Sequence, residues 1–396
     1  MGLRTRRWRV ILIAVVSIVW SAFPGLSHAS IRAQELPQPP DVSAKAAFVR
    51  DISAGVDLYD LNGEDRLSAG STIKIATAIV ARATVDLDSE VLILESDPVE
   101  EGYSTMELIV GDTLTVEQLL LGLLIPSGGD AAQALARYAG ATLLGVDPDT
   151  VDPQQATTRF VEEMNGLARD LGLQNTQFVN PDGRDAADQF TSARDLTTIA
   201  TEFMKDETLR EMVAMPTYEF ISPGGNTYTK ANTNELLAEP GVIGIKTGSE
   251  TQAGACLVLA SEFGANEVIT VVLGSDLAYD EETSEKTVDR RYDDARAILA
   301  GLEADYRWVE VDDPATVPGL EDALFAWQVT MRDGPELVMP TSGDEDLTFR
   351  LRLGAPGEPE QEVGRVLFFA GSTQVGERPL FQATAAQAGH STPIAA

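Results

Sequence analysis

Strand-like segments lie at both ends of a long helical region, and this order constrains the fold more than any other feature. Residues 46–60 alternate loosely between apolar and polar side chains, and the Asn62-Gly63 pair after them is a strong hairpin turn signal. Strand-like runs return at residues 243–245, 254–260 and 268–273. A strand pair, many helices and then returning strands predict an α+β fold. We expect a mixed sheet with helices on its faces and a helical lobe.

Helical patterns fill the region between these strands. Residues 71–85 are apolar, rich in Ala and Ile and free of Gly and Pro, which indicates a buried helix. Thr115 is placed to cap a helix over residues 116–124, with Gln118 as its capping-box partner. Asp130 is placed to cap the next helix, over residues 131–138. Further helices are predicted over residues 160–171, 192–204 and 288–302.

The character of the chain changes near residue 305. Turn residues such as Asp333-Gly334 and Ser342-Gly343 separate short strand-like runs. These runs cover residues 308–311, 326–331, 347–353, 363–369 and 379–381. The sequence therefore predicts a main domain over residues 42–304 and a small C-terminal all-β domain over residues 305–396.

Residues 1–29 have the pattern of a secretory signal peptide. Four arginines precede an apolar run over residues 10–20, and Ser27-His28-Ala29 supplies small residues for cleavage before Ser30. The alternative is an uncleaved anchor, but the apolar run is shorter than the about 20 residues of a membrane span. We expect an exported, extracytoplasmic protein, in the periplasm or the cell wall space, with a proline-containing linker over residues 30–41.

Charge and residue counts exclude several kinds of chemistry. The chain has 62 acidic and 29 basic residues, a net charge of −33, which repels phosphate backbones and argues against nucleic-acid binding. Its two histidines, His28 and His390, lie near the ends of the chain, and Cys256 is its single cysteine. These counts leave no internal disulfide and no structural zinc site of the Cys/His type. A catalytic nucleophile here would not use histidine as its base.

Ser71 and Lys74 are the first candidate catalytic pair. A spacing of three residues puts both side chains on one helical face, where an amine can take a proton from a hydroxyl. The lysine must be neutral to act as a base, and the apolar residues that follow it offer a desolvating environment. No other lysine of the chain has a serine three residues before it. On this pattern alone, a helix-capping serine and a solvated lysine remain the alternative.

Two more segments carry candidate site residues. Lys246-Thr247-Gly248 follows an apolar run, and such a strand can bind an extended substrate while its Lys and Thr point outward and hold a carboxylate. The alternative is an edge strand guarded by lysine. Ser127-Gly128-Gly129 lies between two predicted helices, either as a simple turn or as a source of a hydroxyl that faces the Ser71–Lys74 pair.

The order and spacing of these three elements resemble the signature of penicillin-binding proteins and class A β-lactamases. Within that superfamily, residues 42–304 resemble the serine-type D-alanyl-D-alanine carboxypeptidases, the low-molecular-mass penicillin-binding proteins. Similar segments include residues 119–135 (LLLGLLIPSGGDAAQAL), 160–183, 191–196 and 232–234. The resemblance implies a penicillin-binding/β-lactamase-like fold, and residues 305–396 are more loosely similar to the family's C-terminal β domain.

The resemblance also implies a role for each motif residue. Ser71 would form an acyl-enzyme with a D-Ala-D-Ala peptide, Lys74 would be the base, and Ser127 would pass a proton to the departing D-alanine. Lys246, Thr247 and Gly248 would bind the substrate, and the backbone N–H groups of Ser71 and Ser249 would form an oxyanion hole. The implied partners are peptidoglycan stem peptides, with β-lactams as covalent inhibitors. No metal and no cofactor is implied.

Gly129 departs from the family pattern. The family's central motif ends in Asn, whose side chain would contact the base lysine and the substrate amide, and glycine supplies neither contact. This leaves a non-catalytic or weakly active peptidoglycan-binding or penicillin-binding protein as an alternative. A β-lactamase is disfavoured, because the position four residues before Asn165 is Val161 and not the glutamate of class A enzymes.

The C-terminal residues differ from those of many relatives, which end in an amphipathic membrane-binding helix. Residues 382–396 have no basic face and little apolar bulk. The sequence therefore predicts no C-terminal membrane anchor.

Overall fold

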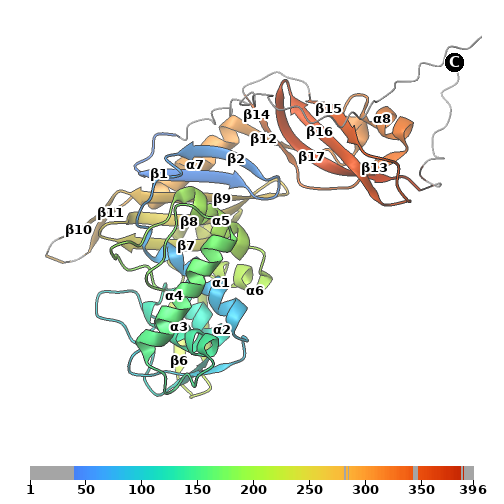
Figure 1. Ribbon diagram of the computed structural model, residues 1–396. Coiled ribbons are helices and arrows are strands. Elements are labelled where there is room, and N and C mark those ends of the chain that lie inside the picture. Colours follow the sequence, from blue (N-terminus) through green and yellow to red (C-terminus); the bar gives the residue numbers. More distant parts are fainter. Residues whose placement is uncertain (1–39, 281, 284, 342–346, 385–386, 388–396) are drawn as a thin grey trace, which may run out of the picture. The chain divides into compact units, whose positions relative to one another are not determined.

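A five-stranded antiparallel sheet joins the two strand-like regions of the sequence (Figure 1). The computed structural model describes residues 40–396, apart from 281, 284, 342–346, 385–386 and 388–396. The sheet order is β2-β1-β9-β8-β7. Its strands are β1 (Ala46–Asp51), β2 (Val56–Leu61), β7 (Val242–Glu250), β8 (Gly254–Phe263) and β9 (Asn266–Ser275). The predicted α+β class is confirmed, but the expected mixed sheet is wrong, because all neighbouring strands pair antiparallel. Short turns join β1 to β2 and β7 to β8 to β9, and such turns connect antiparallel strands.

The turn between β1 and β2 differs from the predicted one. Asn62-Gly63 lies after β2, so its assignment as the hairpin turn is wrong. The strands are joined by residues 52–55, where Gly55 takes a φ of 72° and the carboxylate of Asp51 accepts the N–H of Ala54 at 2.7 Å. A side-chain acceptor and a glycine therefore make this turn without the expected dipeptide.

Helices cover both faces of the sheet. On one face α1 and α5 lie in a core with β1, β8 and β9, and on the other face α7 packs through Ala295, Ile298 and Leu302. The larger helices are α1 (Lys74–Thr84), α2 (Val116–Leu124), α3 (Gly129–Leu144), α4 (Pro153–Asp170), α5 (Ala193–Phe203), α6 (Glu207–Val213) and α7 (Arg291–Asp305). Short 3-10 turns occur at η1 (Gly70–Ile73) and η2 (Glu235–Ala238). Paired short strands are β3 (Glu90–Leu92) with β4 (Thr113–Thr115), β5 (Thr217–Ile221) with β6 (Thr227–Ala231), and β10 (Leu277–Tyr279) with β11 (Lys286–Asp289).

A side-chain cap marks the beginning of α2 but not that of α3. The capping box of Thr115 and Gln118 at α2 is present as predicted. Asp130 is not the cap of α3, because that helix already begins at Gly129. Its carboxylate instead accepts the backbone N–H groups of Met106 and Leu108, both at 3.0 Å. Asp130 thus ties the loop before α2 to the start of α3.

The C-terminal segment has its own apolar core, formed by residues such as Val366, Phe368 and Leu380. Its strands are β12 (Tyr306–Val309), β13 (Val329–Met331), β14 (Leu337–Pro340), β15 (Leu347–Leu353), β16 (Glu362–Ala370) and β17 (Thr373–Gln382). The segment is not all-β as predicted, because it contains η3 (Pro314–Thr316) and α8 (Leu320–Trp327). The predicted strand over residues 326–331 is half wrong, because α8 ends inside it. Gln328, at a φ of 53°, makes the turn from helix to strand.

Two of the sequence-based expectations fall outside the described residues. The signal segment and nearly all of the linker lie in residues 1–39, and most of the segment expected to lack an anchor lies in residues 385–396. In the part of the chain that is described, no helix is both long enough and apolar enough to cross a membrane.

A buried ion pair fixes the long loop between β3 and β4. Arg137 on α3 donates to both carboxylate oxygens of Asp97 at 2.7 Å, and both side chains are 1% exposed. The same guanidinium donates to the backbone carbonyls of Leu92 and Pro148. Because the charge is enclosed and all its bonds are short, this pair anchors the loop over residues 94–112 on α3.

We predict that Asp97→Ala lowers the free energy of unfolding by about 3–5 kcal/mol, because it leaves the buried Arg137 charge unpaired. Urea unfolding followed by circular dichroism would measure this. The matched control is Glu202→Ala, which removes the exposed Lys205–Glu202 pair and should change stability by no more than about 0.5 kcal/mol. Equal effects of the two variants would contradict the anchoring role of Asp97.

Candidate active site

Ser71 and Lys74 meet where η1 runs into α1. The Nζ atom of Lys74 lies 2.7 Å from Oγ of Ser71 and 2.7 Å from the backbone carbonyl of Asp182. Lys74 is 2% exposed, because α1 lies inside the apolar core. The predicted placement of the Ser71 and Lys74 side chains on one helical face is therefore confirmed.

Burial of the amine changes its acidity. Desolvation lowers the pKa of Lys74 to about 8, while the nearby carboxylates of Asp182, Glu250 and Asp130 act in the opposite direction. A lysine with this pKa is partly neutral near pH 8. The amine can then accept the Ser71 proton while one of its own N–H groups donates to the Asp182 carbonyl.

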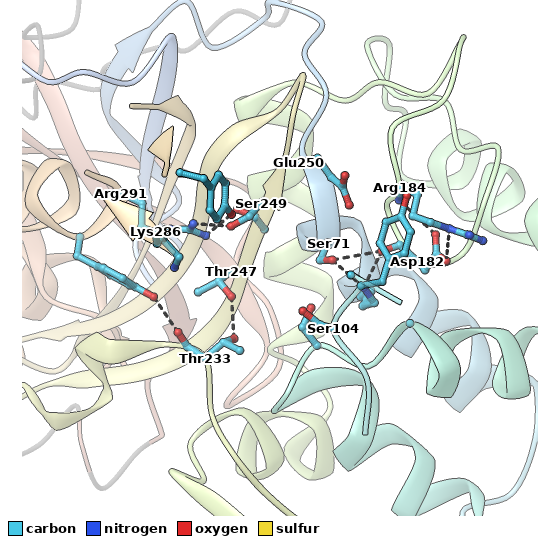
Figure 2. A pocket seen from close by; sticks show the side chains of 18 residues that line it. Ser71, Ser104, Asp182, Arg184, Thr233, Thr247, Ser249, Glu250, Lys286 and Arg291 are labelled. Carbon is cyan, nitrogen blue, oxygen red and sulfur yellow. Dashed lines mark hydrogen bonds and ion pairs between the residues drawn. The ribbon is translucent and has the colours of Figure 1, made fainter. Parts of the chain in front are cut away.

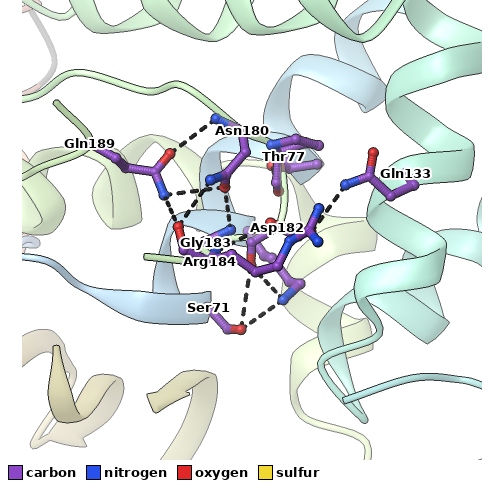
Figure 3. A network of polar contacts seen from close by, with 10 residues as sticks. Ser71, Thr77, Gln133, Asn180, Asp182, Gly183, Arg184 and Gln189 are labelled. Carbon is purple, nitrogen blue, oxygen red and sulfur yellow. Dashed lines mark hydrogen bonds and ion pairs between the residues drawn. The ribbon is translucent and has the colours of Figure 1, made fainter. Parts of the chain in front are cut away.

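The loop over residues 180–185 presents that carbonyl (Figure 3). The side-chain oxygen of Asn180 accepts the N–H of Gly183 at 2.8 Å, and Oγ1 of Thr77 on α1 donates to the carbonyl of Pro181 at 2.6 Å. Gly183 has a φ of 88°, and a Cβ there would lie 2.2 Å from the carbonyl oxygen of Gly70. Only glycine lets this loop lie directly against the turn that carries Ser71.

Ser127 lines a cavity together with Ser71 and Lys74, and its backbone conformation is unusual. Its φ is 67°, which is uncommon for a residue with a side chain. It is buried, and its Oγ has no hydrogen-bond partner among the described residues. A strained residue with an unsatisfied hydroxyl beside Ser71 and Lys74 is typical of a functional site.

β7 forms the opposite wall, at the edge of the sheet. A Cβ at Gly248 would lie 2.6 Å from the carbonyl oxygen of Ala69 and 3.1 Å from the N atom of Ser71, so glycine is required for this approach. The hydroxyls of Thr247 and Thr233 are 2.7 Å apart. The backbone of β7 therefore lies directly against the turn that carries Ser71.

Lys246 does not point outward, and that part of the strand prediction is wrong. Its side chain is 1% exposed, and Nζ donates to the carbonyl of Thr247 at 3.1 Å. Burial, with the charges of Lys74 and Arg291, holds the pKa of Lys246 well below its usual value. The close packing of β7 against η1 encloses this side chain, which alternation along an edge strand could not reveal.

Arg291, at the start of α7, is a site residue that sequence reasoning missed. Its guanidinium donates to the carbonyl of Gly248 at 2.6 Å and to Oγ of Ser249 at 2.5 Å. Nε pairs with Asp289 at 2.7 Å, and the side chain is 1% exposed. No local motif marks this arginine, because its role depends on α7 packing behind β7.

A cavity of about 240 Å³ lies between these walls (Figure 2). It brings together Ser71, Lys74, Ser127, Thr247, Gly248 and Ser249 of the predicted set, whereas Lys246 is not among its lining residues. Its lining also includes residues that sequence reasoning missed: Tyr103, Ser104, Arg184, Thr233, Glu250, Tyr279, Lys286, Arg291 and Tyr292. Most of these come from loops and strand ends, whose positions no sequence periodicity predicts.

Gly129, the residue that departs from the family motif, also lines the cavity. Its N–H donates to the carbonyl of Ser104 at 2.8 Å, so the loop before α2 lies directly over it. A Cβ at Gly129 would make ordinary contacts, at 3.4 Å to Val99 and 3.5 Å to Ser104. The backbone thus does not require glycine at this position.

Comparisons with known proteins match most of the chain. A family model described as D-alanyl-D-alanine carboxypeptidase matches residues 33–277. The D-alanyl-D-alanine carboxypeptidase of Streptomyces sp. (strain K15) is 38% identical over 250 residues, which cover 60% of this chain and 82% of that protein. D-alanyl-D-alanine carboxypeptidase DacD of Escherichia coli (strain K12) is 27% identical over 393 residues, and the match covers 94% of each protein.

Solved structures show the same likeness. The Streptomyces K15 DD-transpeptidase superposes with a TM-score of 0.59 at 35% identity, over 67% of this chain and 98% of that chain. Penicillin binding protein 6B from Escherichia coli superposes with a TM-score of 0.63 at 26% identity, over 87% of this chain and 97% of that chain. The expected penicillin-binding-protein fold is confirmed.

We predict that Gly129→Ala raises the free energy of unfolding by about 0.5 kcal/mol, because alanine lowers the entropy of the unfolded chain and meets no clash. Gly128→Ala is the control. A Cβ there would lie 2.7 Å from the carbonyl oxygen of Gly122, so this variant should be less stable than the wild type. Urea unfolding compares the two, and destabilisation by Gly129→Ala would contradict the prediction.

Proposed function

The chain belongs to the D-alanyl-D-alanine carboxypeptidase family, and on that premise we propose that it is a serine-type carboxypeptidase of peptidoglycan stem peptides. The observation that carries this proposal is the contact of Ser71 Oγ with the buried amine of Lys74 at 2.7 Å. A hydroxyl beside a buried lysine of lowered pKa is an activated nucleophile. The chain offers no histidine between residues 28 and 390 for that task.

The reaction begins with proton transfer from Ser71 to neutral Lys74. Oγ of Ser71 then forms a bond to the carbonyl carbon of the penultimate D-alanine, and the carbonyl oxygen takes the negative charge. The backbone N–H groups of Ser71 and Ser249 stabilise that oxyanion. Their backbones are neighbours, since a Cβ at Gly70 would lie 3.1 Å from the N atom of Ser249.

Collapse of this intermediate breaks the peptide bond. The proton held by Lys74 passes through the hydroxyl of Ser127 to the nitrogen of the departing D-alanine, which gives Ser127 Oγ the partner it lacks in the free protein. Water then attacks the ester on Ser71, which releases the shortened peptide and restores the hydroxyl. A β-lactam would acylate Ser71 in the same way and act as a covalent inhibitor.

The terminal carboxylate of the substrate binds at the Thr247 side of Ser71. The hydroxyls of Thr247 and Thr233 line the cavity there together with Arg291 and Lys286. Arg291 supplies positive charge and holds Ser249 and the Gly248 carbonyl in place. Lys246 lies on the same face of β7 as Gly248, close to Lys74, but its side chain is buried and does not line the cavity.

The proposal also covers where the protein is located and how the chain divides into domains. The stem peptide lies outside the cytoplasm, which fits a cleaved signal segment over residues 1–29 and an extracytoplasmic location. Residues 42–304 contain every residue given a role above, whereas residues 305–396 are proposed to form a separate β domain with its own core.

We expect the purified protein to release D-alanine from a peptide that ends in D-Ala-D-Ala, and Ser71→Ala to release none, because the variant has no nucleophile. A coupled D-amino-acid oxidase assay measures the product. Circular dichroism of both proteins is the control for folding. Folded wild-type protein without activity would refute the carboxypeptidase assignment and favour a peptidoglycan-binding protein.

The pH profile tests the role of Lys74. Only the neutral amine can accept the Ser71 proton, so kcat/KM should rise as pH increases through about 8, the pKa to which burial lowers Lys74. Initial rates between pH 6 and 9.5 at constant ionic strength would show this limb. A profile that is flat from pH 7 to 9 would exclude a base with this pKa.

A further inference from the structure

The β10–β11 hairpin presents two neighbouring side chains to the cavity. The two strands pair antiparallel, and Tyr279 on β10 is the cross-strand partner of Lys286 on β11. Both residues line the cavity. Directly opposed residues of an antiparallel pair project from the same face of the hairpin, so these two side chains form one continuous surface.

This surface lies on the side of the cavity where the last residue of the substrate would bind. Nε of Arg291 and the ammonium group of Lys286 both bind Asp289, at 2.7 and 2.8 Å. Figure 2 shows Lys286 and Arg291 on the far side of Thr247 from Ser71. With the scissile carbonyl at Ser71 and the terminal carboxylate at Thr247, a long side chain on the last residue comes within reach of the hairpin.

Lys286 carries a positive charge that its partner neutralises only in part. Desolvation acts to raise the pKa of Asp289, but hydrogen bonds from Arg291 and Lys286 lower it below its usual value, so this carboxylate stays ionised. One carboxylate shared by two cations leaves one net positive charge. An ammonium group has three N–H donors, and Lys286 uses one of them within the described part of the chain. Its side chain is 42% exposed, so a ligand can reach the other two.

Tyr279 adds an apolar surface beside this charge. It is 50% exposed, and neither its ring nor its hydroxyl has a partner among the described residues. Tyr292, a neighbouring aromatic residue of the lining, is instead buried and donates to the carbonyl of Thr233 at 2.7 Å. An exposed ring can cover the methylene groups of a side chain whose charged end binds the adjacent ammonium group.

We propose that Tyr279 and Lys286 form a subsite for an acidic side chain on the last residue of the substrate. The protein then also hydrolyses peptides in which a D-residue with a carboxylate side chain, such as D-glutamate, replaces the terminal D-alanine. The peptide bond broken and the water consumed are those of the proposed reaction, and the acidic D-amino acid leaves in place of D-alanine. This inference rests on the proposed carboxypeptidase function and adds a class of leaving residue to it.

The test uses the full chain and two peptides that differ by one charge. Both have the same sequence up to the penultimate D-alanine, and one ends in D-glutamate whereas the other ends in D-glutamine. The two side chains have the same size, so the ratio of kcat/KM isolates the effect of the carboxylate. A charge-assisted hydrogen bond to a partly exposed ammonium group should favour the D-glutamate peptide about fivefold. Lys286→Gln should bring this ratio to one or below, as measured by mass spectrometry of the released amino acids.

Lys205→Gln is the matched control. Lys205 also forms an exposed ion pair with a carboxylate three residues away, Glu202, but it does not line the cavity. The chain carries a net charge of −33 and repels any anion, and this variant measures that general effect. We expect it to keep the preference of the wild type. A preference lost equally in Lys205→Gln would assign the effect to overall charge and overturn the inference.

Salt gives an independent measurement of the same contact. The wild-type preference should fall toward one at about 0.5 M NaCl, because salt screens a partly exposed charge pair. A preference that salt leaves unchanged would not come from the charge of Lys286 and would overturn the inference.

A third peptide, which ends in D-Ala-D-Ala, separates the two proposals. If the wild type cleaves this peptide alone, the carboxypeptidase function stands and the inference is overturned. If the D-glutamate and D-glutamine peptides are cleaved equally, or if Lys286→Gln keeps the fivefold preference, the inference is again overturned and the function stands. If folded wild-type protein cleaves none of the three, the proposed function fails, and the inference fails with it.

Discussion

The buried amine of Lys74, held between the Ser71 hydroxyl and the Asp182 carbonyl, is the contact on which the site depends. An amine in water would stay protonated at neutral pH and could not act as a base. The apolar packing of α1 removes that water, and the carbonyl gives the amine a fixed direction. The hydrophobic core and the chemistry of this protein therefore share the same helix.

Two close backbone approaches bring the rest of the site to this amine. Gly183 lets the loop of Asp182 lie on the Ser71 turn, and Gly248 does the same for β7 from the opposite side. A side chain at either position would separate the segments, because the neighbouring atoms are backbone atoms that cannot turn aside. β7 is also at the edge of the sheet, where an exposed strand edge can pair with an extended peptide.

Charge divides the cavity into two ends. Arg291 and Lys286 lie at the Thr247 side, where a terminal carboxylate would bind, whereas Glu250 lies at the end of β7. The protein as a whole is strongly acidic, so the cationic end is a local feature that buried hydrogen bonds maintain.

The sequence by itself determined the cap of α2 at Thr115 and the Ser71–Lys74 spacing, because these depend on interactions within a few residues. The order of strand-like and helical segments determined the α+β class. The sequence also indicated a strand at Lys246-Thr247-Gly248, and β7 lies at the edge of the sheet. Only the tertiary structure decided that Lys246 is enclosed, that Asp182 meets Lys74 from 108 residues away, and that Arg291 supports Gly248. The same holds for Glu250. Whether a charged side chain is solvated, paired or left available depends on which distant segments pack around it, and no local pattern contains that information.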